Sequence, residues 1–478
     1  AIENYLVLST LKPVKFVKEI IMSDHSKRII IPSYNEAFKI WLKIGLLSFG
    51  GPAGQIAMMH RTLVEEKKWI DEARFLHALN YCMLLPGPEA QQLATYIGWL
   101  IHKTAGGLIA GLLFILPGAL VMLGLSIIYV LYADVPLVTA AFIGIKAAVL
   151  VVVIEAVIRI GRRAITSTWM LAISIMAFIA IFFFSISFPI IIISAAFAGF
   201  IGNLLYSGSP KTVPKEITAR KIKDSLIERM ELDGKLAHTH PSLSRAVFIT
   251  FLFLLLWFVP ILLIFIFTEK GNIFVQQSLF FSKLAVVTFG GAYAVLAYMA
   301  QQAVEVFSWL SAQEMLDGLG LAETTPGPLI LVTQFVGFLS AYRFTPGMDP
   351  IVAGVLGSGI VLWVTFTPCF LWIFLGAPYI ETLRKNMSIA AALSGITAAV
   401  VGVVLNLAVW FGLHVSFSDI QYETIFYFLV PVPNFQSASI LSLGLTFFAG
   451  ILLLFFKQGV FRTLCACTSA SIIITLVG

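Results

Sequence analysis

Charged residues are scarce in this chain. They make up 12% of its 478 residues, whereas a soluble domain carries roughly 25%. Hydrophobic residues reach 59%, and the mean hydropathy is +0.95. Apolar runs such as residues 106–132 exceed the ~20 residues that a helix needs to cross a bilayer. The composition therefore predicts an all-α polytopic membrane protein with the lipid bilayer as its surroundings. We expect this multi-pass protein in the plasma membrane.

Cysteines and enzyme motifs are equally rare. The four cysteines lie in apolar segments, and no histidine or further cysteine accompanies them at the spacing of metal ligands. No Ser-His-Asp arrangement and no His-Glu-x-x-His motif is recognisable. We therefore expect no catalytic residues, no metal, no cofactor and no enzymatic activity. The net charge of +6 comes from basic residues in short loops, so we expect no nucleic-acid partner.

What the sequence does contain is an internal repeat. The stretches "KIGLLSFGG" (43–51) and "KLAVVTFGG" (283–291) share a lysine, a phenylalanine and two glycines at an offset of 240 residues. The triplet Pro-Gly-Pro recurs at the same offset, at 86–88 and 326–328. A constant spacing over forty residues is not expected from chance.

The repeat continues after the second triplet. A longer loop there increases the offset to 251 residues, at which Pro117 pairs with Pro368. Residues 36–165 and 273–414 are therefore predicted to be two copies of one unit, interrupted by discontinuous helices.

This repeat divides the chain into six parts. They are an amphipathic segment on the inner membrane surface (1–35), a first transmembrane repeat with additional spans (36–206), a charged cytoplasmic connector (207–245), a linking span (246–272), the second repeat (273–414) and C-terminal apolar helices (415–478). The C-terminal helices are expected to pack the bundle or to pair two protomers in a homodimer.

The number of spans decides how the two copies face. Seven are expected before the second copy: 36–62, 71–103, 106–132, 136–160, 169–186, 189–206 and 246–267. An odd number inverts the second copy. With the N-terminus inside, most Lys and Arg residues fall on the inner side, as the positive-inside rule requires. The outer side then receives Arg61, Lys67, Lys68, Arg74, Lys270 and Arg343.

The alternative concerns residues 71–103. If this segment is a re-entrant hairpin with Pro-Gly-Pro at its tip, instead of one broken crossing, the count changes by one. The two copies would then be parallel. The charge distribution favours the broken crossing and the inverted arrangement, which is typical of secondary transporters.

The Pro-Gly-Pro triplets predict helix breaks inside the membrane. Proline lacks an N–H group and is favoured at the first helical position, so one half-helix ends near Leu85 and a new one starts near Pro88. The new helix presents unpaired N–H groups and a partial positive charge, both of which a bound anion satisfies. The second triplet provides an equivalent start at Pro328.

The Phe-Gly-Gly motifs and two lysines extend this site. The glycine pairs 50–51 and 290–291 let backbone approach backbone or ligand. Lys43 and Lys283 each precede the first glycine by seven residues, which is about two helical turns. Together they predict a cationic pocket for a small anion. For the glycines, the alternative is a purely steric role in helix packing. For the lysines, the alternative is a position near the ends of spans, from which the side chains reach the headgroups.

The resulting predictions name fifteen substrate-site residues and two candidates for coupling. The substrate site comprises Lys43, Gly50, Gly51, Gln55, Pro86, Gly87, Pro88, Gln92, Lys283, Gly290, Gly291, Thr325, Pro326, Gly327 and Pro328. For the polar members, hydrogen bonding between helices is the alternative. Glu89 is a coupling candidate because a carboxylate beside an anion repels it unless protonated. Lys146 is the other, unless an acid of another span or Glu155 neutralises it.

The motifs also carry a resemblance. The stretch from "FGGPAGQ" to "LLPGPEAQQLATYIG" (49–98) resembles the N-terminal signature of the chromate ion transporter family, and the stretch from "FGGAYAV" to "TTPGPLILVTQFVG" (289–337) resembles that of its second half. The resemblance implies a long two-domain member whose halves face opposite ways and which exports chromate chemiosmotically, with sulfate as a related substrate. The family motifs fall on Phe49, Gly50, Gly51, Pro52, Gln55, Pro86, Gly87, Pro88, Glu89, Phe289, Gly290, Gly291, Pro326, Gly327 and Pro328.

The sequence thus predicts a secondary transporter that exports chromate through an oxyanion site at the membrane midplane. The alternatives are a transporter of sulfate or another divalent oxyanion, and an anion channel of the same fold.

Overall fold

The computed structural model describes residues 31–205, 225–269, 271–289, 292–379, 387–425 and 428–477. Six helices in these ranges are long and apolar enough to span a membrane: Glu89–Tyr132, Pro136–Ala164, Leu243–Phe267, Pro350–Tyr379, Ala390–Ser416 and Val460–Val477. The predicted all-α polytopic membrane fold is confirmed. The predictions for residues 1–30, for residues 207–224 of the connector and for Gly290 and Gly291 lie outside the described residues.

The same order of elements occurs twice along the chain. The first series is α2 (Tyr34–Leu47), α3 (Gly51–His60), the π-helix η1 (Arg61–Glu66), α4 (Glu72–Cys82), α5 (Glu89–Tyr132) and α6 (Pro136–Ala164). The second series is α11 (Ile273–Val287), α12 (Ala292–Ala300), the π-helix η3 (Gln301–Val306), α13 (Ala312–Thr324), η4 (Leu329–Leu331), α14 (Val332–Phe344), α15 (Pro350–Gly376), η5 (Ala377–Tyr379) and α17 (Met387–Ser416).

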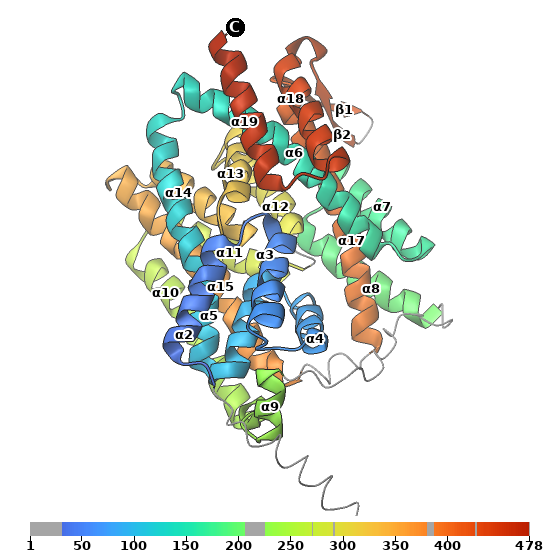
Figure 1. Ribbon diagram of the computed structural model, residues 1–478. Coiled ribbons are helices and arrows are strands. Elements are labelled where there is room, and N and C mark those ends of the chain that lie inside the picture. The colour runs from blue at the N-terminus through green and yellow to red at the C-terminus, as the bar shows by residue number, and fades with distance from the viewer. Residues whose placement is uncertain are drawn as a thin grey trace, which may run out of the picture.

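The remaining elements connect and follow these two series. Between them lie α7 (Thr168–Phe182), α8 (Phe188–Leu205), α9 (Leu226–Leu232), η2 (Ala237–Thr239) and α10 (Leu243–Phe267). After them come the strands β1 (Ile420–Ile425) and β2 (Phe428–Pro433), then η6 (Phe435–Ser437), α18 (Ile440–Gly450), η7 (Ile451–Phe455) and α19 (Val460–Val477). Figure 1 shows α9 at one end of the molecule and the β1–β2 hairpin at the other.

The segment 36–62 enters the molecule and returns to the end where it started. Near its beginning, Tyr34 packs against His102 with ring centroids 4.6 Å apart. After α3 and η1, the Lys67 ammonium lies 3.0 Å from the Glu36 carboxylate, and Trp69 packs against Trp41. The chain therefore turns back at Phe-Gly-Gly, and the expected crossing is wrong. We call the end where Pro32, His102 and α9 lie the first end.

The segment 71–103 also returns to the first end. Arg74 at its start forms an ion pair with Glu231, and Trp99 near its end packs against His238, so both contact residues 225–240. At His102 and Lys103 the backbone leaves helical geometry, and residues 104–132 of α5 run back alongside 89–101. A Cβ built on Gly98 would lie 2.5 Å from the carbonyl oxygen of Gly106, which shows how closely these parts pack.

Two of the seven expected crossings are therefore re-entrant hairpins. The sequence alternative for 71–103 is the one observed, but 36–62 behaves likewise, so the parity of the count is unchanged. Four of the six basic residues expected outside, Arg61, Lys67, Lys68 and Arg74, lie at the first end instead. There the carbonyl oxygen of Lys68 accepts a hydrogen bond from the N–H of Leu226.

The hairpins of the second series enter from the opposite end, here called the second end. Residues 104–132 of α5 start beside Gly98 and reach Tyr129, whose hydroxyl donates to the Asp317 carboxylate of α13. The 24 residues from Gly106 to Tyr129 span roughly 35 Å of helix. Arg343 at the end of α14 contacts Glu314 at the start of α13, so this pair also returns to its own end.

Local chemistry explains the tight returns. Asp71 caps α4 by accepting a hydrogen bond from the N–H of Arg74, and Ser311 caps α13 in a capping box with Glu314. Lys68 and Ser308, 240 residues apart, both have positive φ, 52° and 50°. In each series, a residue with positive φ follows the π-helix, and an N-cap residue starts the next helix a few residues later.

The C-terminal part differs from the expectation of helices alone. The strands β1 and β2 pair antiparallel, with Tyr422 opposite Pro431. The following α18, η7 and α19 pack on α6, where the Ser471 hydroxyl donates to the carbonyl oxygen of Ala140. Two prolines of β2, Pro431 and Pro433, suit an edge strand, which needs no further pairing.

Candidate anion site

The four breaks meet at the centre of the molecule. The Gly87 N–H donates to the carbonyl oxygen of Thr288 at 2.8 Å, and the Gly327 N–H donates to that of Ser48 at 2.9 Å. Each bond joins a Pro-Gly-Pro break in one series to the residue before Phe-Gly-Gly in the other. Gly87 and Gly327 have φ of 124° and 87°, a region that favours glycine. We call this arrangement the central crossing.

The prolines delimit the helices as predicted. Pro88 is the N-cap of α5, which begins at Glu89, and Pro328 is the N-cap of η4, which leads into α14. The carbonyl oxygen of Pro326 lies against Gly118 of α5, where a Cβ would approach it to 2.0 Å. The backbone of the second break thus contacts α5 directly at a glycine, which has no side chain to keep it away.

Several residues predicted to bind substrate instead support this backbone. The Gln55 amide donates to the carbonyl oxygen of Gly327 at 2.6 Å, and the Gln92 amide donates to that of Pro86 at 2.8 Å. The Thr325 hydroxyl donates to the carbonyl oxygen of Leu321. These three side chains are buried, and only the bond of Gln55 links elements of the two different series. Contact of the three side chains with substrate stays a prediction.

Replacing Gln55 by Leu should destabilise the protein by about 1–3 kcal/mol, because the buried carbonyl oxygen of Gly327 loses this donor. Gln276→Leu is the matched control. Its amide also donates to a backbone carbonyl oxygen, that of Gly271, but at an exposed position where solvent can substitute. Thermal unfolding in detergent should give a lower midpoint for Gln55→Leu only. Equal midpoints for the two variants would contradict this role of Gln55.

A cavity of about 630 Å³ leads from the first end to the central crossing. Its walls come from α3, α4, the first Pro-Gly-Pro break, the last turns of α6 and the start of α12. Two predicted residues line it, Gly87 and Glu89, together with Pro52 of the family motif. Its other polar side chains are His60, Glu65, Arg159, Arg163, Tyr293 and Thr397.

Two arginines supply the positive charge of the cavity. Arg159 and Arg163 are one turn apart on α6, and Arg159 lies 3.1 Å from Glu155. The Arg163 guanidinium donates to the Met83 sulfur at 3.3 Å, and no carboxylate in the described ranges pairs with it. From the sequence, both arginines are expected only to belong to the basic residues of the inner side. Their i, i+4 spacing at the end of an apolar span was the signal that they share one helix face.

The two predicted lysines lie outside this cavity. Lys43 is exposed and 3.7 Å from Glu66, and Lys283 is exposed with its ammonium 6.0 Å from the Tyr298 ring centroid. The reason is the orientation of α2, which buries Trp41, Ile44 and Gly45 and turns Lys43 away. A lysine pair is therefore not the source of positive charge in this cavity.

Lys146 is neutralised by an acid of another helix. Its ammonium lies 3.1 Å from the Asp317 carboxylate and also donates to Gln313. It does not line the cavity, so the structural alternative stated for Lys146 is the one observed.

A carboxylate that the sequence analysis missed lies beside the cavity. Glu323, at the end of α13, is 4% exposed, and its Oε1 accepts a hydrogen bond from the Tyr293 hydroxyl at 2.9 Å. A Cβ on Gly51 would lie 3.5 Å from that hydroxyl and 4.0 Å from Glu323 Oε2. The acid in "LAETTPGP" stands in an otherwise apolar stretch just before the break, which is the same signal that selected Glu89.

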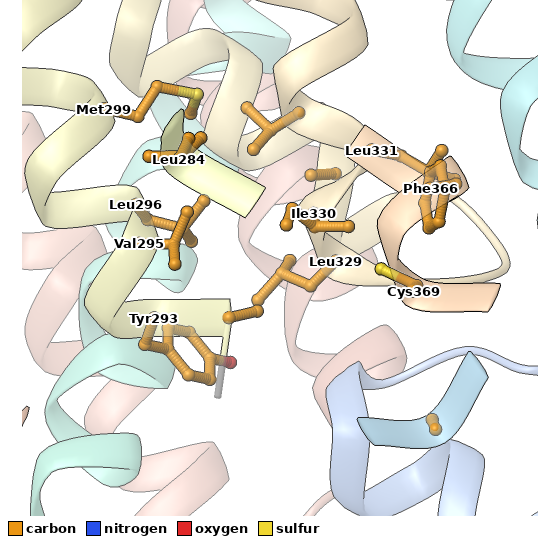
Figure 2. Close-up of a cluster of buried hydrophobic side chains, with 14 of the residues drawn as sticks. Leu284, Tyr293, Val295, Leu296, Met299, Leu329, Ile330, Leu331, Phe366 and Cys369 are labelled. Atoms are coloured by element: carbon orange, nitrogen blue, oxygen red, sulfur yellow. The ribbon is translucent and has the colours of Figure 1, made fainter. Parts of the chain in front are cut away.

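The two series differ at the position after the break. Glu89 lines the cavity, whereas its counterpart Leu329 is 3% exposed. Figure 2 shows Leu329, Ile330 and Leu331 in an apolar cluster with Val295 and Leu296 of α12. The second break is therefore packed among apolar side chains, and the first borders a cavity that also contains charged side chains.

A smaller hollow of about 70 Å³ lies toward the second end. It is lined by α12, η3, α17 and the β hairpin, with Gln301, Glu305, Trp410 and Tyr422 among its residues. Trp410 stands 251 residues after Arg159, and Ala300 stands 240 after His60. The second hollow thus occupies the position matching the large cavity, but no lysine or arginine of the described chain lines it.

Comparisons with known proteins point to one family. The sequence profile of the chromate transporter family matches residues 35–200 and 275–475. A chromate transport protein of Pseudomonas aeruginosa is 31% identical over 378 residues, 78% of this chain and 79% of that protein. A probable chromate transport protein of Synechococcus elongatus is 28% identical over 383 residues, 80% of this chain and 86% of that protein.

An uncharacterised transporter of Methanocaldococcus jannaschii is 27% identical over 390 residues, which are 81% of this chain and 86% of that protein. No solved structure matches the chain.

Proposed function

Because this chain belongs to the chromate transporter family, we propose that it is a secondary transporter that exports chromate across the plasma membrane through an oxyanion site at the central crossing. One observation carries this proposal. The large cavity holds two arginines, one of which has no carboxylate partner in the described chain, and it ends on the broken helix that starts at Glu89.

We place the oxyanion between Arg163, Arg159 and the N-terminus of α5. Chromate is a tetrahedral dianion, and a guanidinium group binds two oxygens of such an anion with parallel hydrogen bonds. The partial positive charge of the α5 N-terminus adds to this attraction. The N–H groups of Gly87 and Gly327 are already bonded to carbonyl oxygens, so they do not donate to the anion. Their hydrogen bonds fix the geometry of the site.

The two series are proposed to be inverted repeats that work by alternating access. The reciprocal hydrogen bonds of Gly87 and Gly327, and the entry of the two sets of hairpins from opposite ends, support this arrangement. The large cavity at the first end and the small hollow at the second end then correspond to an open and a closed access route.

The direction follows from charge and membrane potential. The first end carries the basic residues at 61–74 and 159–163, which supports a cytoplasmic position for it by the positive-inside rule. Moving one charge through 100 mV is worth ~2.3 kcal/mol, so a dianion leaving an interior-negative cell gains ~4.6 kcal/mol. The arginines concentrate the anion at the entrance, and the second hollow lacks such charges. Glu89, on which both arginines act electrostatically, is a candidate coupling group.

Purified protein in liposomes should transport chromate toward the positive side of an imposed potassium diffusion potential. Sulfate should compete, because it has the same charge and shape, and molybdate and phosphate define the selectivity. Flux that saturates and is accelerated by chromate on the trans side distinguishes a carrier from an anion channel of the same fold. Absence of both chromate and sulfate flux under every imposed gradient would end this proposal.

A further inference from the structure

Glu323 is a buried carboxylate with one unsatisfied oxygen. The side chain is 4% exposed, Oε1 accepts the hydrogen bond from Tyr293, and no described group donates to Oε2. Tyr293, its hydrogen-bond partner, lines the cavity, and so does Pro52, the residue after Gly51. A Cβ on Gly51 would lie 4.0 Å from Oε2, so the missing side chain of this glycine leaves Oε2 uncovered on that side.

The charges that face Glu323 do not neutralise it. Arg159 and Glu155 of α6 act on it electrostatically, but they are paired with each other at 3.1 Å. On its own helix, Glu314 is paired with Arg343 and Asp317 with Lys146.

Glu89 is in a different situation. Arg163 and Arg159 both act on Glu89, at the wall of the cavity. The neutral Tyr293 hydroxyl is the hydrogen-bond donor to Glu323. An ionised Glu323 is therefore a buried charge without a full counter-ion, which is costly in a membrane protein.

We propose that Glu323 takes up a proton when the oxyanion binds, so that proton and dianion occupy the site together. This inference rests on the proposed function, since it needs an anion in the cavity. The proton comes from water in the cavity, binds to Oε2 and returns to water when the anion leaves. It removes one negative charge from beside the dianion, and no covalent bond of the substrate changes.

The sign of the coupling follows from electrostatics. A dianion near a carboxylate disfavours its charged form, so anion binding promotes protonation of Glu323. Linkage is reciprocal, so protonation must strengthen anion binding by the same factor. The affinity for the oxyanion should therefore be highest when Glu323 is protonated, and should fall as rising pH removes the proton.

The test uses sulfate, which is a dianion throughout the neutral range, in proteoliposomes between pH 6 and 9. In the wild type, the KM for sulfate should rise with pH by up to about tenfold per pH unit, the limit for one coupled proton. In Glu323→Gln, which keeps an acceptor for the Tyr293 hydroxyl, the KM should stay near its low-pH value. Glu423→Gln, an exposed change on β1, is the control and should keep the wild-type pH dependence.

A second measurement does not depend on transport. Adding sulfate to the weakly buffered protein in detergent should cause uptake of about one proton per anion bound in the wild type, and less in Glu323→Gln. Tyr293→Phe serves if Glu323→Gln fails to fold. Loss of the hydroxyl removes a donor to the ionised carboxylate, so the fall in affinity should move to higher pH.

The outcomes separate the two proposals. If wild-type protein moves neither sulfate nor chromate, the proposed function fails. If it moves them and Glu323→Gln keeps the wild-type pH dependence and proton uptake, the assignment to Glu323 is overturned and the transport function stands. If Glu89→Gln changes the pH dependence and the proton uptake and Glu323→Gln does not, the coupled proton binds to Glu89.

Discussion

Replacing Arg163 by Gln is expected to lower the affinity for chromate by roughly 10- to 150-fold. The guanidinium lies in the cavity without a carboxylate partner in the described chain, so its full charge is available to the anion. Hydrogen bonds to charged groups contribute about 1.5–3 kcal/mol, which gives this range of affinities. The measurement is the KM for chromate flux in proteoliposomes at fixed potential.

Arg162→Gln is the matched control for this prediction. Arg162 is adjacent in sequence and exposed, but it does not line the cavity, so the variant should transport like the wild type. Arg163→Lys keeps the charge and loses the planar fork that binds two oxygens, and should fall between the two. If Arg162→Gln and Arg163→Gln were equally impaired, general surface charge and not a defined site would explain the effect.

Replacing Gly118 by Ala is expected to destabilise the protein and to abolish transport. A Cβ at this position would lie 2.0 Å from the carbonyl oxygen of Pro326, which is backbone and cannot rotate away. Overpacking of this kind costs about 1–3 kcal/mol, and occasionally more, because the surrounding backbone must move. Here the backbone that moves is the second Pro-Gly-Pro break, which holds Ser48 through Gly327.

Gly124→Ala on the same helix provides the control. No atom lies within 4 Å of a Cβ at Gly124, so the variant should be as stable as the wild type or, because alanine favours helix, more stable by up to about 1 kcal/mol. Thermal unfolding in detergent and chromate flux should both separate the two variants. A Gly118→Ala protein with normal stability and flux would show that the central crossing tolerates displacement.

The sequence predicted the positions of the breaks because those depend on local backbone chemistry. Proline without an N–H group and glycine with positive φ allow few alternatives, and α5 accordingly starts at Glu89 directly after Pro88. The membrane class was equally accessible, since it follows from long apolar segments. Matching π-helices and caps also lie 240 residues apart, although the sequence did not predict their geometry.

The path of the chain through the membrane was not accessible in the same way. Residues 36–62 and 71–103 are long and apolar enough for single crossings, but each forms two half-length helices packed inside the protein. Hydropathy measures the exclusion of water and does not distinguish a crossing from a buried return. This explains why the basic residues at 61–74 were placed at the wrong end.

Some residues of the cavity could be predicted from the sequence, and others only from the packing of the helices. Glu89 was found because an acid next to a break is unusual, and Gly87 because the break needs it. Arg159, Arg163 and Tyr293 come from α6 and α12, and only the packing of these helices against the first break brings them together.

By itself, the sequence determined that this is a helical membrane protein with duplicated breaks, since both properties are consequences of residue type and close neighbours. The tertiary structure decided which charges face the cavity, leaving Lys43, Lys146 and Lys283 outside it and placing two arginines and a buried glutamate around it. The physical reason is that a helix presents only one face to a given neighbour, and which face that is depends on packing between segments far apart in the chain.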